Sequence, residues 1–410
     1  MMKFFHSLII ACLVLLTSCH KDDDFEPPTE AGKTVLVCML GQNSLGTSGV
    51  LREDSMEMAS GAVYLDKNSN NRLIVMIENA GHPNLYEVVP NKGFQLLKHY
   101  NRNLNTTSLE DFQAILDDVT ELAPAQEYRL VLGSHATGWL PARKTMKKSF
   151  GIDVGENGNR GSDTKADGSY GDEMEIADLA KAIENSRMKH LKHLFFDACL
   201  MQTLEVAYEL RHVTDYITAS PIAISADGSN YTLLLQKNAF FSDDMTQIAK
   251  INVEDYRYRY WGTVMSVIQT DALDDLAQFT RNVLPHSTWA NPDMSDVLDY
   301  GYYAKLTYYR PHYYDAAEAM KKLLGDNENL YTQWREKLDK AIIYKGFTEK
   351  FYVQTSIWDG VFRTPDAELN CGVSMFIPLP VYTENTSKAE AYGDHNENFA
   401  ATAWAKYILN

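Results

Sequence analysis

The chain has 410 residues and a formal net charge of −17, from 55 acidic and 38 basic residues. This acidic balance argues against binding to nucleic acid or to an anionic membrane surface, and it favours cationic substrates. The length allows one large domain or two smaller ones with a substantial core.

The N-terminus predicts export and a lipid anchor. An almost continuously apolar run over residues 4–16 is too short to span a membrane stably and is typical of a signal peptide. Thr17 and Ser18 then precede Cys19, as in bacterial lipoprotein signals, in which cleavage makes the cysteine the acylated N-terminus. The alternative is an ordinary secretory signal with an incidental cysteine. No other long apolar stretch follows, so we expect the N-terminal lipid to be the protein's only contact with the membrane.

Four segments are expected along the chain. Residues 1–18 form the signal peptide, and the acidic, proline-containing residues 19–32 form a tether. Residues 33–235 are expected to form an α/β domain, and residues 236–410 a helix-rich region that completes the same unit.

Residues 33–220 alternate between apolar strands and amphipathic helices. Such an order indicates an α/β fold whose mostly parallel sheet is covered by helices on both faces. The expected strands are 34–40, 72–77, 128–132, 193–198 and 216–219, with a hairpin over 85–100 and helices over 108–123, 173–185 and 203–210.

Two later regions have different compositions. Residues 143–171 contain six glycines and few apolar residues, which predicts a long exposed loop. Beyond Asp227 the pattern is helical and aromatic-rich, with 264–284 and 300–324 as the longest expected helices and 372–378 as a late strand.

A histidine and a cysteine each follow a predicted strand. His135 comes just after the strand 128–132, and Cys199 comes directly after the strand 193–198. Because side chains at the carboxyl ends of parallel strands meet at one edge of the sheet, an imidazole and a thiol are expected to face each other there. An imidazole beside a thiol supports the nucleophilic thiolate and protonates a leaving amine. Taken singly, His135 also fits an ordinary core or loop histidine, and Cys199 a small buried apolar residue.

Cysteine number supports the paired interpretation. If Cys12 leaves with the signal and Cys19 is acylated, then Cys38, Cys199 and Cys371 remain. This odd number in an exported protein predicts at least one free thiol.

The sequence resembles the clostripain family of cysteine peptidases, whose wider clan includes caspases, legumain and gingipains. Residues 135–139 read His-Ala-Thr-Gly-Trp, similar to the family's His-Gly-x-Gly-Trp. Residues 197–201 read Asp-Ala-Cys-Leu-Met and residues 205–210 read Glu-Val-Ala-Tyr-Glu-Leu, as in its nucleophile segment. Further similarity at 219–231, 372–374 and 399–407 extends the resemblance to the whole chain after residue 33.

The resemblance implies a caspase-like fold and an endopeptidase that cleaves after Arg or Lys. It implies that His135 is the general base and acid, that Cys199 is the nucleophile, and that the N–H groups of Ala136 and Cys199 hold the oxyanion. Asp197 and Asp227 match the acids of the family's S1 pocket, which would select a guanidinium or an ammonium group. The alternatives are a strand-end carboxylate for Asp197 and an ordinary Asp-Gly turn for Asp227.

Processing and cofactors also follow from the resemblance. Family members are often activated by self-cleavage between the histidine and cysteine strands, where Lys147 and Lys148 lie; a solvated basic loop is the alternative. Calcium dependence occurs in the family, but the sequence contains no run of spaced acids that places a metal site. The expected partners are protein or peptide substrates with basic residues. The acidic run after Cys19 resembles the surface-export signal of Bacteroidetes lipoproteins, which implies anchoring in the cell envelope, at the outer membrane.

Three departures from the family pattern motivate a second hypothesis. Ala136 replaces a glycine, Pro221 and Ile222 replace a pair of glutamates, and Ser229 replaces a tryptophan. If the turn at Ala136 needs a positive φ, its Cβ is costly. The competing hypothesis is therefore a surface lipoprotein that keeps the peptidase fold as a binding module without turnover. Transpeptidation by the same dyad is a third possibility.

Overall fold

The computed structural model describes residues 26–78, 83–140, 149–284, 292–301, 311–354, 360–379 and 395–409. Cys19, Lys147 and Lys148 lie outside these residues. No helix within the described ranges combines the length and the apolar composition needed to cross a bilayer.

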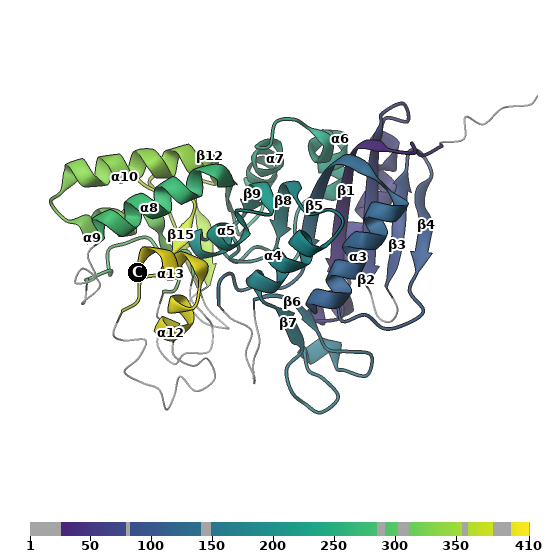
Figure 1. Cartoon of the computed structure of the whole chain (residues 1–410), viewed down its shortest axis with the longest axis horizontal. Helices are drawn as coiled ribbons and strands as arrows, with labels where there is room; N and C mark the ends of the chain where they lie inside the picture. Colours follow the sequence, from purple (N-terminus) through teal and green to yellow (C-terminus); the bar gives the residue numbers. More distant parts are fainter. Residues whose placement is uncertain are drawn as a thin grey trace, which may run out of the picture.

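A mostly parallel sheet forms the centre of the fold (Figure 1). Among the described residues it has nine strands, in the order β12-β10-β9-β8-β5-β1-β2-β3-β4. The five central strands from β9 to β2 are parallel, whereas β3, β4, β10 and β12 add antiparallel edges. The bounds are β1 Ala31–Leu40, β2 Asn71–Glu78, β3 Asn84–Val89, β4 Gly93–His99, β5 Ala125–Gly133, β8 Leu191–Asp197, β9 Thr214–Ala219, β10 Val264–Gln269 and β12 Ile342–Phe347.

Helices cover both faces of this sheet because its central strands are apolar on both sides. In β1, Leu36 and Cys38 pack into one core, and Val35 and Val37 pack into the other. The first face carries α3 Leu109–Leu122, α4 Ile176–Asn185, α5 Leu204–Leu210 and α8 Leu273–Val283, and the second carries α2 Val50–Gly61, α6 Tyr231–Gln236 and α7 Gln247–Tyr256. The predicted α/β class is therefore confirmed.

Local signals explain where several helices begin. Ser108 caps α3, because its side chain accepts a hydrogen bond from the N–H of Asp111. Thr203 caps α5 in the same way, through the N–H of Val206. Asp315 caps α9 Ala316–Leu324 and accepts from the N–H groups of Ala317 and Glu318.

The remaining elements are short or lie near the C-terminus. They are α1 Ser44–Ser48, β6 Phe150–Asp153, β7 Asp172–Met174, β11 Tyr314–Asp315, α9 Ala316–Leu324, α10 Glu328–Ala341, β13 Phe351–Gln354, β14 Gly360–Arg363, β15 Ser374–Met375, α12 His395–Ala400 and α13 Ala403–Ile408, with 3₁₀ turns at Ala62–Tyr64, Arg160–Ser162, Ala239–Phe241 and Thr270–Ala272.

Several sequence predictions need correction. The expected helix 264–284 begins as strand β10, because its apolar residues pair with β9 and β12, and only α8 is helical. Of the expected helix 300–324, residues 302–310 lie outside the described part, and helix α9 begins only at Ala316. The late strand 372–378 is reduced to β15. Helices α1 and α2 were not predicted.

The glycine-rich stretch is more ordered than a long loop. Strands β6 and β7 pair, and the residues between them fold back on themselves through bridges from Thr164 to Asn159 and to Tyr170. This projection, residues 153–172, is called the arm and extends below the sheet in Figure 1.

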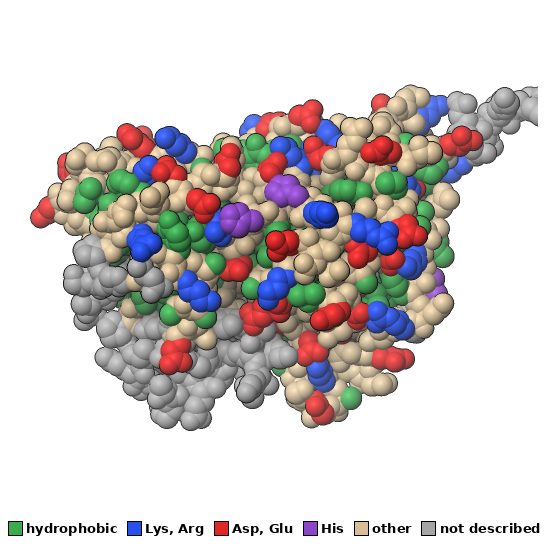
Figure 2. All heavy atoms as spheres, in the orientation of Figure 1, with side chains coloured by type: hydrophobic (Ala, Val, Ile, Leu, Met, Phe, Trp, Pro, Cys, Tyr) green, Lys and Arg blue, Asp and Glu red, His purple; other side chains and the backbone are tan. Residues whose placement is uncertain are grey.

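Charge is spread over the face that carries α3, α4 and α5. Figure 2 shows acidic and basic side chains interspersed on this face, without a large area of one sign. The net charge of −17 is therefore not gathered into one patch there.

Candidate active site

The histidine and cysteine turns follow neighbouring parallel strands. Strand β5 pairs with β8, and Gly133 lies opposite Asp197 at the end of this pairing. His135 and Cys199 each follow two residues later. Both side chains are half-buried and line one pocket of about 130 Å³. The structure thus brings the two predicted residues to the same pocket.

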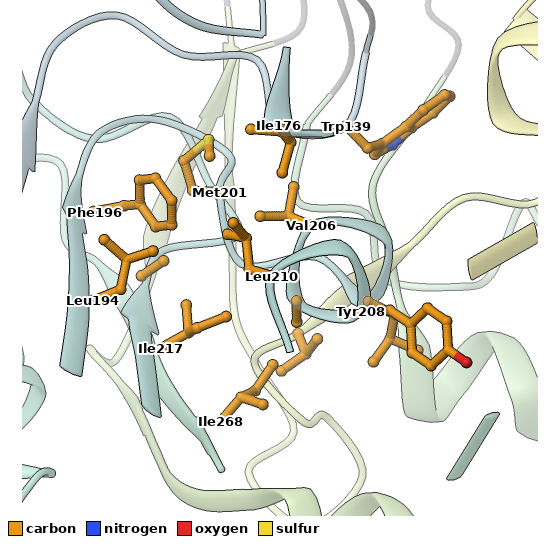
Figure 3. Close-up of a cluster of buried hydrophobic side chains, with 14 of the residues drawn as sticks. Trp139, Ile176, Leu194, Phe196, Met201, Val206, Tyr208, Leu210, Ile217 and Ile268 are labelled. Carbon is orange, nitrogen blue, oxygen red and sulfur yellow. The ribbon is translucent and has the colours of Figure 1, made fainter. Parts of the chain in front are cut away.

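The cysteine turn is anchored from below by the hydrophobic core. Figure 3 shows the side chains that hold α5 against the sheet on either side of this turn. They are Leu194 and Phe196 of β8, Ile217 of β9, Ile268 of β10, Met201 of the turn, and Val206 and Leu210 of α5.

The two turns pack tightly against each other. Leu200, directly after Cys199, has a φ of 62°, which is uncommon for a residue with a Cβ. Gly138 has a φ of 67°, and a Cβ there would lie 2.4 Å from the carbonyl oxygen of Leu200. Tyr313 donates its hydroxyl to the carbonyl of Thr137 at 2.6 Å. Gly138 is therefore required both for its backbone conformation and for the close approach of the two turns.

Ala136 carries no backbone strain. Its φ is not positive, and it forms an antiparallel bridge with Phe150, with hydrogen bonds from Thr137 N to Ser149 O and from Gly151 N to His135 O. In this arrangement the N–H of Ala136 donates to no residue that the structure describes. The departure from the family glycine is thus accommodated.

His135 contacts a serine and, through it, a carboxylate. Nε2 of His135 lies 2.9 Å from Oγ of Ser44, which donates to Oδ2 of Asp163 at 3.0 Å. The N–H of Ser44 also donates to Oδ1 of Asp163, at 2.7 Å. Ser44 begins α1 just after β1, and Asp163 lies in the arm. The sequence analysis identified neither residue, because only the fold brings these segments to the histidine.

Asp197 lines the pocket as an acceptor of three hydrogen bonds. The N–H and hydroxyl of Ser229 donate to it at 3.1 and 3.2 Å, and the hydroxyl of Tyr231 donates at 3.0 Å. Burial raises the pKa of Asp197, and these donors work in the opposite direction by stabilising the carboxylate. Ser229, which replaces the family tryptophan, is therefore a partner of this acid.

Asp54 is a second pocket carboxylate, and the sequence analysis missed it. It lies on α2, is 6% exposed, and accepts no hydrogen bond from the described residues. Burial, followed by the negative charges of Asp197 and Glu57, raises the pKa of Asp54 to about 9. No motif signals this residue, because α2 reaches the pocket only through the folded sheet.

Asp227 lies beside the pocket and does not line it. Its side chain is exposed and accepts a hydrogen bond from Ser225 at 3.2 Å, whereas its neighbours Ala226 and Gly228 are lining residues. Asp227, predicted as an acid of the substrate pocket, thus lies at the rim of the pocket, and Asp54 lies deeper.

The residues that replace the family glutamates support the cysteine turn. The carbonyl of Ile222 accepts a hydrogen bond from the N–H of Leu200, and that of Ser220 accepts from Gln202. The carbonyl of Ile224 lies 3.9 Å from the sulfur of Cys199. These contacts use backbone atoms, so Pro221 and Ile222 can replace other side chains without disturbing the turn.

The three described cysteines are free thiols in different environments. Cys38 and Cys371 are fully buried, and burial raises the pKa of each thiol far above its ordinary value. Cys199 is half-buried in the pocket wall. Among the described residues, no group of three or more His, Cys, Asp or Glu side chains is arranged to hold a metal ion, so no calcium site is assigned.

Comparison with known proteins gives a consistent result. The sequence profile of the clostripain family matches residues 37–408. A secreted C11 cysteine protease from Bacteroides thetaiotaomicron, solved with an irreversible peptide inhibitor, has a TM-score of 0.73 at 27% identity and covers 92% of this chain and 100% of its own. An inactive zymogen C11 protease from Parabacteroides distasonis also has a TM-score of 0.73 at 27% identity, over 93% of this chain and 99% of its own. No match was found among the curated proteins.

The fold of a second secreted C11 protease from Bacteroides thetaiotaomicron is also similar, with a TM-score of 0.71 at 21% identity over 93% of this chain and 100% of its own. The family profile spans nearly the whole described fold, including both strand-end turns. The chain belongs to the clostripain family and is a cysteine protease with a caspase-like α/β fold.

Proposed function

We propose that the protein is an exported endopeptidase that cleaves peptide bonds after Arg or Lys through Cys199 and His135. The observation that carries this proposal is the pocket itself, which His135, Cys199, Asp197 and Asp54 line together. A cationic side chain that enters this pocket meets the carboxyl groups of Asp197 and Asp54, while its scissile carbonyl lies near the sulfur.

The chemistry requires one proton shuttle. The thiolate of Cys199 attacks the carbonyl carbon, and the N–H groups of Ala136 and Cys199 stabilise the oxyanion. Protonated His135 gives its proton to the leaving amine, and the C–N bond breaks to leave a thioester. His135 then takes a proton from water, which attacks the thioester and releases the acid. The N–H of Ala136 donates to no described residue, which supports its role as an oxyanion donor.

The N-terminal segment determines where the protein is located, and the basic segment at Lys147 and Lys148 determines how it is activated. Residues 1–18 direct export and Cys19 carries the lipid, which anchors the protease to the cell envelope. The description of two Bacteroides thetaiotaomicron relatives as secreted supports export. Lys147 and Lys148 are the proposed processing positions, and the description of the Parabacteroides distasonis relative as a zymogen supports activation by cleavage.

Profiling with a peptide library tests the proposal. Protein lacking residues 1–18 is assayed directly and after limited trypsin treatment, with the trypsin then inactivated by a serine-specific reagent. We expect cleavage after Arg and Lys that is lost in Cys199→Ala. Cleavage after other residues would overturn the specificity, and a folded wild type that cuts no peptide in either state would support the binding-module hypothesis.

A further inference from the structure

Beyond the two residues of the dyad, we propose that Ser44 and Asp163 are positioning residues that act on His135 as a hydrogen-bonded relay from the arm. The inference rests on the proposed role of His135 as base and acid. It assigns a function to the arm, to which the family resemblance gives none.

The direction of the hydrogen bonds determines which nitrogen of His135 carries a proton. A carboxylate only accepts hydrogen bonds, so the single proton of the Ser44 hydroxyl is used by Asp163, which lies 3.0 Å away. The remaining lone pairs of the serine oxygen face Nε2 of His135 at 2.9 Å, so this nitrogen carries a proton. In the neutral imidazole Nδ1 is then the nitrogen that accepts a proton during catalysis.

The relay also favours the protonated imidazole. When His135 takes up a proton, the positive charge is shared along the chain from N–H to hydroxyl to carboxylate. The negative charge of Asp163 lowers the free energy of this state, in the way that a carboxylate supports a catalytic histidine in other hydrolases. Its effect is weaker than that of a direct contact, because a hydroxyl group separates the two charges.

The segment that carries Ser44 is held firmly on the sheet side. Asn43 donates its side-chain amide to the carbonyls of Leu40 and Ile152, at 2.8 and 3.0 Å, and accepts from the N–H of Leu45. Asn43 is fully buried, so α1 starts at a fixed place at the end of β1. The hydroxyl of Ser44 is therefore positioned by buried contacts and not by its own flexibility.

The arm presents Asp163 from the other side. Its root is tied to the end of β1, because Val154 N donates to Gln42 O and Gln42 Nε2 donates to Gly155 O. Asp163 has a φ of 56°, a left-handed conformation that Asp tolerates better than most residues, and its carbonyl accepts from Gly171 N. A residue held in an uncommon conformation by several contacts is typical of a functional position.

Four variants test the relay in activated enzyme. Asp163→Asn and Ser44→Ala are expected to lower kcat about 10- to 100-fold with little change in KM. Ser44→Thr, which keeps the hydroxyl, should restore most of this loss. Asp167→Asn is the matched control, because Asp167 lies in the same arm and, among the described residues, accepts hydrogen bonds only from the N–H and the hydroxyl of Ser169. It should retain wild-type kcat.

A spectroscopic readout separates positioning from simple structural damage. In protein with ¹³C-labelled histidine, the pKa of His135, assigned with His135→Gln, should be lower in Asp163→Asn and Ser44→Ala than in the wild type and in Asp167→Asn. An unchanged pKa, or kcat equal to that of Asp167→Asn, would overturn the relay while leaving the dyad intact. If the wild type has no activity, or if His135→Ala retains it, the proposed function itself fails.

Discussion

The two sides of the active-site pocket are built in different ways. His135 and Cys199 follow strands β5 and β8 directly, and their turns are locked together where Gly138 meets Leu200. Asp54 and Asp163, by contrast, come from a covering helix and from the arm, and approach the site from outside the sheet. In the proposed function, the strand ends supply the reacting groups, and the surrounding elements supply the charges that act on them.

The two acids of the pocket also differ in the hydrogen bonds that they accept. Asp197, at the end of β8, accepts three hydrogen bonds, whereas Asp54 accepts none from the described residues. A carboxylate with several donors keeps its charge in a buried place, and one without donors takes up a proton. We therefore expect Asp197 to ionise more readily than Asp54, and Asp54 to ionise when a cation binds.

Gly138→Ala gives the largest expected effect, because it separates the two strand-end turns. The new Cβ would meet the carbonyl oxygen of Leu200 at 2.4 Å, so one of the turns must move. A displacement of this order between reacting groups costs about 100-fold in kcat. Gly168→Ala is the control: its φ of 81° is also left-handed, but nothing lies within 4 Å of its Cβ. Equal kcat in the two variants would show that the turns are not coupled.

Asp54→Asn gives a smaller effect, on specificity. The variant should lose about 10- to 100-fold in the preference for a P1 Arg over its uncharged isostere citrulline, since a charged hydrogen bond is lost. In the wild type this preference should rise with pH up to about pH 9, as Asp54 ionises, and the rise should be absent in the variant. The measurement is kcat/KM for both peptides between pH 6 and 9.

Stability gives an independent check on Asp54. Because its pKa is raised in the folded state, the native protein holds a proton there that the unfolded chain releases, so this contribution to stability falls between the ordinary Asp pKa and about 9. Asp54→Asn should therefore lose less stability than the wild type as the pH rises through this interval. Asp227→Asn, at the exposed rim, is the matched control and should resemble the wild type. Identical pH dependence in all three proteins would contradict the assignment.

The sequence was most informative about the sheet and about the candidate site residues that directly follow its strands. The apolar strands and their order predicted the sheet, and the motifs at 135–139 and 197–201 marked two strand ends that the fold brings to one pocket. Asp54, Ser44 and Asp163 could not be found in this way. None of the three belongs to the motifs that mark His135 and Cys199, and only the packing of α2, α1 and the arm determines their contacts.

The sequence predicted the wrong type of element where pairing with distant strands decides between helix and strand. The segment 264–269 has a pattern that fits a helix or a strand, and it becomes β10 because β9 and β12 offer hydrogen-bonding edges. Ala136 is the opposite case, in which a departure from a motif suggested strain and the backbone shows none.

The central claim, that Cys199 is the nucleophile of a pocket selective for basic side chains, is tested most directly by covalent labelling. Activated protein is treated with a peptidyl acyloxymethyl ketone carrying Arg at P1, and the modified peptide is identified by mass spectrometry. We expect one label per chain, on Cys199, slower labelling by the citrulline analogue, and no label on the buried thiols of Cys38 and Cys371. Equal labelling of Cys199 by both reagents, or modification at another cysteine, would contradict the account.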